Sequence, residues 1–209
     1  VTFSGNSSLS IIEGGAFRNA GLRNITIPKS VTKINAYAFI ANVQLTTVNF
    51  EIGGTEALEL TDGYSYDPNT GLKGNQFASC VNLTTVTLPS RLTVIGQNAF
   101  SGCSSLFSVE FEDAANSNLT TISKSAFYEC GSLYSFTVTP KVDVNKIGSG
   151  AFRYCNNLIE IYNMTQVDIA NNDACYYTSY LIRYAENIYN ASEGNSNINS
   201  SDDFVFYSD

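Results

Sequence analysis

The sequence contains no histidine and no tryptophan, and charged residues make up only 14% of its 209 positions, against roughly 25% in an average soluble domain. Without histidine the chain has no imidazole base, no Ser-His or Cys-His nucleophile pair and no histidine-bound zinc. Lys and Arg number 11 against 19 Asp and Glu, which gives a net charge of −8. A nucleic-acid binder needs a Lys/Arg-rich face to displace the counterions of the phosphates. These absences disfavour most familiar enzymes and argue against nucleic acid as a partner.

Long apolar runs are also absent, because no stretch reaches the ~18 uninterrupted apolar residues of a membrane-spanning helix. The chain opens on Val1 without a charged and then apolar leader. Hydrophobic residues nevertheless make up 44% of the sequence, which is enough for a folded core. We therefore expect a folded protein that does not insert into a membrane.

What the sequence does contain is an internal repeat. The dipeptide Ala-Phe occurs five times at similar intervals, and a sixth, degenerate copy reads Gln76-Phe77. The six phenylalanines are Phe17, Phe39, Phe77, Phe100, Phe127 and Phe152, at spacings of 22, 38, 23, 27 and 25 residues. A leucine follows each of them after five or six residues and opens a run in which apolar and polar residues alternate, such as LTTVTL from Leu83. This alternation predicts a short strand with one buried face.

Proline follows three of these runs, at Pro28, Pro89 and Pro140, and ends a strand because it removes a ladder donor. Next comes a pair of apolar residues three positions apart, such as Leu92 and Ile95, a spacing that suits either a strand or an irregular turn. A unit of ~23 residues cannot bury its own apolar side, so such units stack and share one core. We expect a coil of about six units, with parallel strands along one face and the phenylalanines as an internal spine.

These residues resemble the leucine-rich repeats of the BspA-like, or Treponema-pallidum-type, family, whose unit reads roughly L-x-x-I-x-I-P-x-x-V-x-x-I-G-x-x-A-F-x-x-C. Residues 90–111 follow this pattern closely. The resemblance implies a leucine-rich-repeat solenoid over residues 1–162, with an inserted loop at 61–75. Residues 163–209 are expected to form an atypical acidic, Tyr-rich module that is cut short. The family also implies a bacterial secreted or cell-surface protein that adheres to host proteins or to other cells.

The cysteines follow the repeat. Four of the five, Cys80, Cys103, Cys130 and Cys155, lie three residues after the repeat phenylalanine, where the first two units have Ala20 and Asn42. Stacked units place equivalent side chains about 4.8 Å apart and parallel, whereas a disulfide needs Cβ atoms near ~3.8 Å that converge. We predict a ladder of buried, reduced cysteines. Cys175 lies outside the register and is the one candidate for a reactive thiol, although no nearby cation is expected to lower its pKa.

Carboxylate pairs are the remaining route to catalysis or metal binding. Glu110 and Glu112 are two residues apart on a strand and are expected to share one face, and glycoside hydrolysis uses paired carboxylates, but their repeat positions are ordinary solvent positions. The other acidic pairs are Asp62 with Asp67, and Asp202 with Asp203. Oxygen ligands of this kind suit calcium, but the chain has no D-x-[DN]-x-[DN]-G loop. We expect no metal, no cofactor and no enzymatic activity.

A row of outward strand residues is the first candidate for binding. It consists of Thr26, Asn49, Thr87, Glu110, Thr137 and Tyr162, one from each unit. On a leucine-rich coil such a row lines the extended strand face, which offers a broad surface for a protein partner. The variety of the row suits tuned recognition as well as plain exposure to solvent.

Tyrosine-rich segments are the other two candidates. The insertion carries Tyr64 and Tyr66 among turn-forming residues, and tyrosine is favoured at interfaces. From residue 161 onward, the chain has seven acidic residues against Arg183 alone, and it holds seven of the thirteen tyrosines. This segment either covers the end of the core or forms an acidic contact patch for a cationic partner. Within it, Tyr184-Ala185 lies near the expected Ala-Phe position.

The sequence therefore predicts a non-catalytic, extracellular or cell-surface scaffold that binds a protein ligand on a host or neighbouring cell. A purely structural spacer in a large surface protein is one alternative. An accessory carbohydrate-binding region of a larger enzyme is another. The ligand and the oligomeric state do not follow from the residues.

Overall fold

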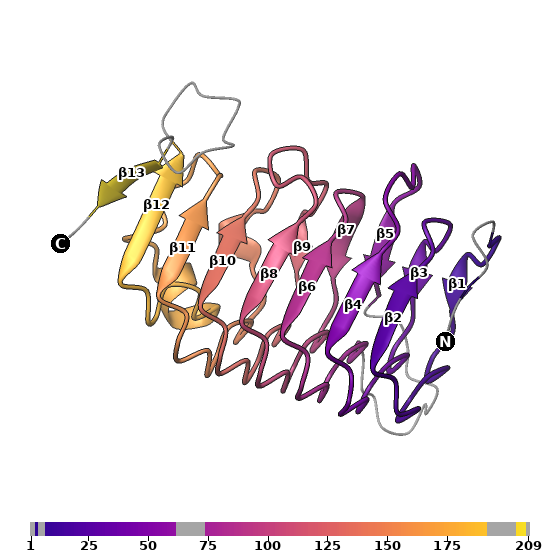
Figure 1. The fold of residues 1–209 in the computed structure, drawn as a ribbon. Helices are drawn as coiled ribbons and strands as arrows, with labels where there is room; N and C mark the ends of the chain where they lie inside the picture. The colour runs from indigo at the N-terminus through magenta and orange to yellow at the C-terminus, as the bar shows by residue number, and fades with distance from the viewer. Residues whose placement is uncertain (1–2, 4–6, 62–73, 192–203, 208–209) are drawn as a thin grey trace.

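The computed structural model describes residues 3, 7–61 and 74–191, together with the backbone of 204–207. The chain winds into a solenoid in which each turn contributes one strand to a front sheet and a shorter segment to the back (Figure 1). The front sheet has eight strands in the order β13-β12-β11-β10-β8-β6-β4-β2, and the back sheet has five in the order β1-β3-β5-β7-β9. This is the predicted leucine-rich-repeat architecture.

The front sheet is parallel from β2 to β12. Its strands are β2 Asn24–Ile27, β4 Thr47–Phe50, β6 Thr85–Leu88, β8 Ser108–Phe111, β10 Ser135–Val138, β11 Glu160–Asn163 and β12 Asn187–Ala191. The last strand, β13 Phe204–Tyr207, pairs with β12 in the antiparallel direction. The sheet thus extends beyond the expected solenoid of residues 1–162, since β12 pairs with β11 in the same register as the repeats before it.

The back of the solenoid shows which structure is adopted by the apolar pairs three residues apart, whose spacing suited both a strand and a turn. Five of the apolar pairs lie in or beside short strands, which are β1 Ile11–Ile12, β3 Lys33–Ile34, β5 Leu58–Leu60, β7 Leu92–Ile95 and β9 Thr121–Ile122. The next turn has the 3₁₀ helix η1 Val144–Lys146, capped by the side chain of Asp143. The turn after it has the π-helical η2 Ala174–Thr178. Back segments therefore change from strands to helical turns toward the C-terminal end.

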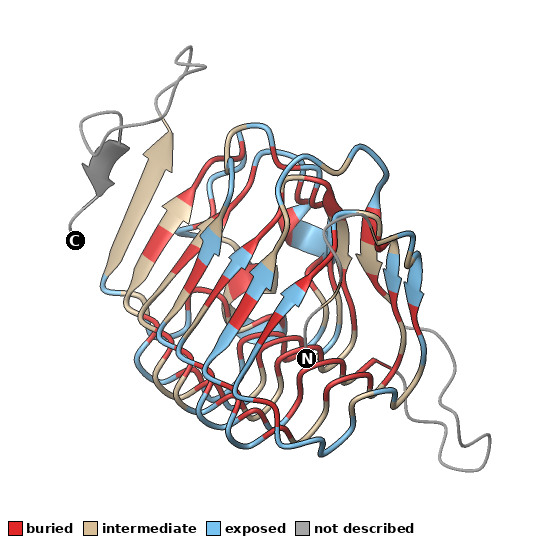
Figure 2. Ribbon diagram, turned by 45° about the vertical axis from the view of Figure 1, so that its right-hand side comes forward, coloured by how far each residue is buried: buried red, intermediate tan, exposed pale blue. Residues whose placement is uncertain are grey.

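The interior is built on the repeat phenylalanines. Their rings form one continuous stack with centroids 5.0–5.4 Å apart, from Phe17 through Phe39, Phe77, Phe100 and Phe127 to Phe152. All but Phe17 are fully buried, and buried residues fill the space between the two sheets (Figure 2). The leading leucines and the inward strand residues complete the same core. The predicted spine is confirmed.

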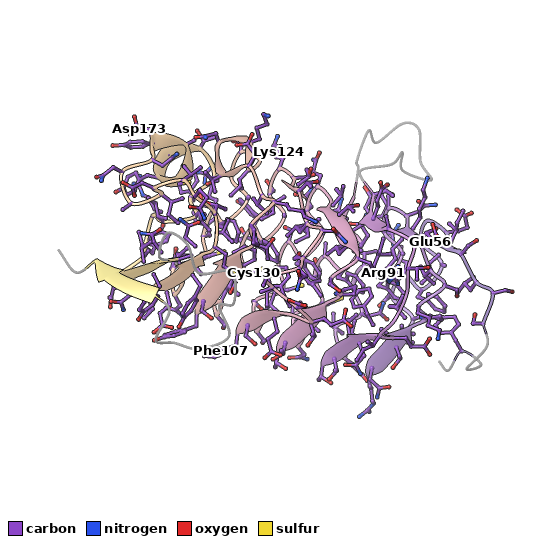
Figure 3. All side chains as sticks on the ribbon, turned by 90° about the horizontal axis from the view of Figure 1, so that it is seen from above. Glu56, Arg91, Phe107, Lys124, Cys130 and Asp173 are labelled. Carbon is purple, nitrogen blue, oxygen red and sulfur yellow. The ribbon has the colours of Figure 1, made fainter. Side chains whose placement is uncertain are left out.

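A ladder of thiols runs beside this stack. The Sγ atoms of Cys80, Cys103, Cys130 and Cys155 each donate to the carbonyl oxygen of a repeat phenylalanine in a preceding turn, at 3.0–3.4 Å. All five cysteines are buried and unpaired, as predicted, and Figure 3 places Cys130 inside the solenoid between Phe107 on the front and Lys124 on the back. In the second turn the amide of Asn42 replaces the thiol and donates to the carbonyls of Phe17 and Phe39 at 2.8 Å. The ladder thus satisfies carbonyls that the turns leave inside.

Two left-handed residues bracket the Ala-Phe position in each of six turns. The residues before it are Gly15, Tyr37, Asn75, Asn98, Ser125 and Gly150, and those two after the phenylalanine are Asn19, Ala41, Ser79, Gly102, Glu129 and Tyr154, all with φ between 50° and 72°. Three of these twelve are glycine and three are asparagine, and the other six are residue types without a preference for this conformation, so the turns impose it at equivalent positions of the repeat. Non-glycine residues adopt such φ values uncommonly.

In the last turn, the residues at the Ala-Phe position and at the leading-leucine position differ from those expected. The N–H of Phe152 donates to the carbonyl of Ser179 as that of Phe127 donates to Ala151, so Ser179 occupies the alanine position. Tyr184-Ala185 is therefore not the Ala-Phe equivalent. Because the N–H of Glu186 donates to Ile159, Ala185 instead takes the place of the leading leucine.

Candidate functional site

The predicted row of outward residues lies on the front sheet, which we call the strand face. Thr26 is opposite Asn49, Thr87 is opposite Glu110, and Thr137 is opposite Tyr162 in the parallel register. The first four side chains are exposed, and Thr137 and Tyr162 are half-buried. The sequence thus placed these residues on one surface correctly, while their use in binding stays a prediction.

An aromatic–acidic patch occupies the C-terminal part of the strand face. It consists of Phe107, Tyr134, Glu160, Tyr162 and Tyr189, and its rings form two stacked pairs. Phe107 stacks on Tyr134 with centroids 5.5 Å apart, and Tyr162 stacks on Tyr189 at 4.8 Å. Phe107 is 55% exposed, which is unusual for a phenylalanine on a folded surface. Four rings therefore stand on adjacent strands of a rigid sheet.

Glu160 joins the two pairs of rings. Its Oε1 accepts a hydrogen bond from the hydroxyl of Tyr134 at 3.1 Å, and its Oε2 accepts one from Tyr162 at 2.9 Å. Tyr134 precedes β10 and Tyr162 lies in β11, so the carboxylate ties neighbouring turns together. The two bonds fix both phenols, and the stacked partners of these phenols fix the ring planes.

The same carboxylate keeps the phenols protonated. Burial, followed by the hydrogen bond and charge of Glu160, raises the pKa of Tyr162 to about 12. The hydrogen bond to Glu160 is also the largest cause that raises the pKa of Tyr134 above its usual value. Burial and then the charge of Glu160 raise the pKa of Tyr189. The phenols of the patch therefore ionise at higher pH than exposed tyrosines do.

Negative charge on the strand face collects at this end. Glu110, Glu160 and Glu186 lie on or directly before β8, β11 and β12, whereas Arg23 lies before β2 at the opposite end. Among the described residues, the one ion pair is Lys146 with Asp143, which belongs to the back of the solenoid. Glu110, Glu160 and Glu186 thus have no ion-pair partner among the described residues.

The tyrosines of the insertion, Tyr64 and Tyr66, lie outside the described residues, as do the acidic pairs Asp62 with Asp67 and Asp202 with Asp203. The predicted contact role of the insertion stays a prediction. Within the described part of the chain, no group of three or more Cys, Asp or Glu side chains is placed to hold a metal ion.

The carboxylates of Glu110 and Glu112 have separate structural uses. Glu112 accepts hydrogen bonds from the N–H and the hydroxyl of Ser90, both at 3.0 Å. Glu110 accepts one from the hydroxyl of Thr87 at 3.4 Å. Each carboxylate thus bonds a residue of the preceding turn.

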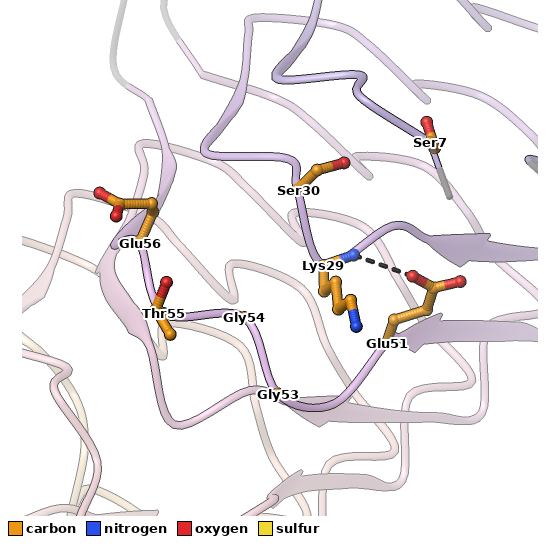
Figure 4. A pocket seen from close by; sticks show the side chains of 8 residues that line it. All are labelled: Ser7, Lys29, Ser30, Glu51, Gly53, Gly54, Thr55 and Glu56. Carbon is orange, nitrogen blue, oxygen red and sulfur yellow. Dashed lines mark hydrogen bonds between the residues drawn. The ribbon is translucent and has the colours of Figure 1, made fainter. Parts of the chain in front are cut away.

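A polar pocket of about 410 Å³ opens at the other end of the molecule (Figure 4). The side chains of Ser7, Lys29, Ser30, Glu51, Thr55 and Glu56 line it together with Gly53 and Gly54. Glu51 repeats the role of Glu112, because its carboxylate accepts a hydrogen bond from the N–H of Lys29 at 3.1 Å. In the pocket wall, the carboxylate of Glu51 is therefore engaged in a contact between neighbouring turns.

Arg91 supports the floor behind this pocket. Arg91 is buried, with 6% of the residue exposed, and its Nη1 donates to the carbonyls of Val31 at 2.7 Å and Glu56 at 3.3 Å. A Cβ at Gly54 would lie 2.6 Å from its Nε. Burial lowers the pKa of Arg91, although the charge of Glu112 opposes this. Through its hydrogen bond to Glu56, Arg91 stabilises the irregular turn that precedes β5.

Sequence reasoning missed three residues of the patch, Phe107, Tyr134 and Glu160, and it counted Tyr189 among the C-terminal tyrosines without placing it on the strand face. Phe107 and Tyr134 occupy the position directly after the leading leucine, and aligning that position across the repeats would have found them. Tyr189 was not placed on this face because Ala185 replaces the leucine that precedes each of the six earlier strands of the front sheet. Glu160 carries no signal of its own, since its importance arises from two phenols that belong to different turns.

Comparison with known protein families identifies the repeat. The family model described as "BspA type Leucine rich repeat region (6 copies)" matches residues 1–60 and 70–207. A comparison with curated proteins gave no match. Among the described residues, no helix has the length and apolar character needed to span a bilayer.

Solved structures with a related fold come from bacteria. A leucine-rich repeat protein from Eubacterium ventriosum is 23% identical with a TM-score of 0.49, over 72% of this chain and 32% of its own. The pneumococcal vaccine antigen PcpA is 25% identical with a TM-score of 0.48, over 71% and 31%. A leucine rich cell surface protein from Faecalibacterium prausnitzii is 22% identical with a TM-score of 0.49, over 90% and 48%. This chain thus spans less than half the length of each.

The family model covers nearly the whole chain, and the matched repeats are the turns that form the phenylalanine stack and the front sheet. The protein belongs to the BspA-type leucine-rich-repeat family.

Proposed function

We propose that this chain is a non-catalytic scaffold at a bacterial cell surface, and that it holds a protein partner on its strand face. The observation that carries the proposal is the aromatic–acidic patch, in which Glu160 lies between the phenols of Tyr134 and Tyr162 on a rigid sheet. Family membership supports the surface location, since BspA-like repeats are typical of secreted and surface proteins. The proposed partner is a protein of a host or neighbouring cell.

The composition of the patch favours a partner with exposed lysine or arginine side chains. Aromatic rings attract a cation over their faces, and Glu110, Glu160 and Glu186 add negative charge without a cation nearby. Opposed charges steer a partner toward the surface and select it against acidic competitors. The stacked rings are already fixed, so binding costs little side-chain entropy.

The predicted row extends this surface. Asn49, Thr87, Glu110 and Thr137 lie on the strands that lead toward the patch, with Tyr162 inside it. Small polar side chains leave the rings standing above the rest of the face and supply hydrogen bonds at its rim. We place the strongest contacts at the patch, because aromatic residues dominate the binding energy of interfaces.

The test is a binding assay of the chain against immobilised host matrix proteins and neighbouring-cell surface proteins. Tyr162→Ala and Tyr134→Ala are expected to weaken binding at least tenfold, and Glu160→Gln is expected to slow association and reduce its salt dependence. Thr121→Ala is the control, because Thr121 is exposed on the back sheet and belongs neither to the patch nor to the row. The double variant Tyr64→Ala/Tyr66→Ala tests the insertion separately. Normal binding by every variant would reject this surface.

The alternatives give different results in the same assay. A structural spacer binds none of the proteins in any variant. An accessory carbohydrate-binding region is retained on neutral glycans through the rings of the patch and loses this retention in Tyr162→Ala.

A further inference from the structure

The last two turns of the solenoid carry a second cluster of tyrosines outside the strands of the front sheet, which we call the arginine–tyrosine ladder. It consists of Tyr154, Arg153, Tyr180, Arg183 and Tyr176. The guanidinium carbon of Arg153 lies 4.9 Å from the ring centroid of Tyr154 and 5.8 Å from that of Tyr180. That of Arg183 lies 4.7 Å from the ring of Tyr176 and 5.7 Å from that of Tyr180. Cations and rings therefore alternate across the last two turns.

The two arginines of the ladder are exposed and have no carboxylate partner among the described residues. Arg153 donates one hydrogen bond to the hydroxyl of Tyr154 at 3.1 Å, and the guanidinium of Arg183 makes only ring contacts. Stacking on a ring holds a guanidinium in a fixed plane and leaves its fork of N–H groups free at the edge. Such a fork binds a carboxylate or sulfate through two parallel hydrogen bonds.

A hollow of about 250 Å³ adjoins the ladder. Ala170, Asn171, Asn172, Asp173, Tyr176 and Tyr177 line it. The ring of Tyr177 is 64% exposed and is held edge-on against Tyr176 at 4.7 Å. The side chains of Asn171 and Asp173 have no hydrogen-bond partner within the described part of the chain, whereas those of Asn172 bond Asn145 and the N–H of Cys175. The hollow therefore offers an exposed ring, a free amide and a free carboxylate.

The local backbone supports a use for these rings. Tyr154 has φ 66° at a position where an earlier turn has Gly102, and Tyr180 has φ 63°. Bulky residues are uncommon at such angles, but the φ of Tyr154 is the one that every earlier turn adopts at this position, so it belongs to the repeat. The π-helical turn η2, which carries Tyr176 and Tyr177, is a rare conformation that occurs often at functional sites.

We propose that the arginine–tyrosine ladder and its hollow form a binding site for an anionic glycan, a polymer of sugar rings that bear carboxylate or sulfate groups. One sugar ring lies in the hollow against Tyr177, with its hydroxyls bonded to Asn171 and Asp173. The acidic group of the same or the next sugar reaches the fork of Arg183, and Arg153 holds the following one. The hollow is smaller than the ~300 Å³ or more of drug-sized pockets, which suits a single ring.

This site is independent of the strand face. Figure 3 shows Asp173 on the back of the solenoid and Phe107 on the front, with the core between them. The charges of the two surfaces also differ, since the patch has Glu160, whereas the ladder has Arg153 and Arg183 next to the one carboxylate of the hollow, Asp173. A glycan bound at the ladder therefore leaves the strand face open.

The experiment titrates the full 209-residue chain with polygalacturonate, heparin, neutral dextran and poly-glutamate. We expect binding to polygalacturonate or heparin that falls as salt rises, and no binding to dextran. Comparing the two anionic glycans separates carboxylate from sulfate as the recognised group. Arg183→Gln and Tyr177→Ala are each expected to weaken binding about tenfold, while Arg183→Lys, which keeps the charge but loses the fork, recovers only part of it.

Two controls make the result specific. Lys124→Gln removes an exposed cation from the same side of the molecule but outside the ladder (Figure 3) and is expected to bind normally. Tyr162→Ala alters the strand face and is also expected to bind the glycan normally. Circular dichroism and thermal unfolding establish that each variant is folded. Equal binding of poly-glutamate, an unchanged affinity in Tyr177→Ala, an equal loss in Lys124→Gln, or no glycan binding at all would each overturn the proposal.

Discussion

The ring of Phe77 stacks on that of Phe39 with centroids 5.0 Å apart and 0° between the planes, although 38 residues separate them in the sequence. Every other neighbouring pair in the stack is 22–27 residues apart. The longer connection therefore leaves the spacing of the core unchanged. The stack, and not the length of the connections, sets the geometry of the solenoid.

Truncating a ring in the middle of the stack should be costly. We expect Phe77→Ala to lower the free energy of unfolding by ~3–5 kcal/mol, because it removes contacts with two neighbouring rings and leaves a cavity. Phe17→Ala should cost clearly less, since Phe17 is only partly buried. Urea unfolding of the two variants measures the difference, and equal losses would contradict a stack that is tightest in its interior.

Gly148 allows two turns to approach closely. A Cβ at this position would lie 2.2 Å from the backbone nitrogen of Lys124, and the N–H of Gly148 donates to the carbonyl of Ile122 at 2.8 Å. Gly148→Ala should therefore destabilise the protein by at least ~2 kcal/mol through overpacking. Gly131→Ala is the matched control, because nothing lies within 4 Å of its added methyl group, and its unfolding midpoint should stay nearly unchanged. A tolerated Gly148→Ala would show that the turns can separate.

The thiols should be unreactive in the folded protein. Burial raises the pKa of Cys80 to about 12 and that of Cys175 to about 11, so little thiolate forms at pH 8. We expect no fast reaction with a disulfide reagent until denaturant is added, when all five thiols react. Rapid labelling of Cys175 in the native protein would contradict this expectation and show that Cys175 is a reactive thiol.

The same pKa shifts predict how stability depends on pH. Cysteines in the unfolded chain ionise near ~8.5, while burial raises the pKa of Cys80, Cys103, Cys130 and Cys175 in the folded protein, so that these thiols stay protonated to higher pH. The unfolded state therefore binds fewer protons above this value, and the free energy of unfolding should fall as pH rises through the window from about 8.5 to 12. A Cys80→Ala variant should lose less stability than the wild type over this window, and an identical decline in both would contradict the assignment.

Tyr162 should ionise later than an exposed tyrosine. Its pKa is raised to about 12, whereas unfolded tyrosine titrates near ~10. The difference in tyrosinate absorbance between wild type and Tyr162→Phe should therefore have its midpoint near pH 12. Glu160→Gln should move that midpoint downward, because it removes the charge that opposes ionisation. A midpoint at the ordinary value in the wild type would show that the patch is open to solvent.

The sequence contained most of the scaffold and little of the surface chemistry. The Ala-Phe register predicted the stack, the cysteine ladder and the outward row, because each depends on equivalent positions repeating along the chain. Glu160 could not be found this way, since its two partners are brought together only by strand pairing. The sequence left the tyrosines after residue 161 either as a cover for the end of the core or as one acidic contact patch, but the fold separates Tyr162 and Tyr189 on the front sheet from Tyr176, Tyr177 and Tyr180 in and after η2. Arg183 then adds positive charge to the cluster at η2.

Each turn of the solenoid is joined by backbone hydrogen bonds, thiols and rings to the turns beside it, so the molecule opens from its ends. Amide exchange should then be slowest around Phe100 and faster toward either terminus. The aromatic–acidic patch and the ladder both lie on the later turns, where opening is easier than in the middle. A ligand that spans neighbouring strands there would act as a clamp on those turns, and its presence would be visible as slower exchange at β11 and β12.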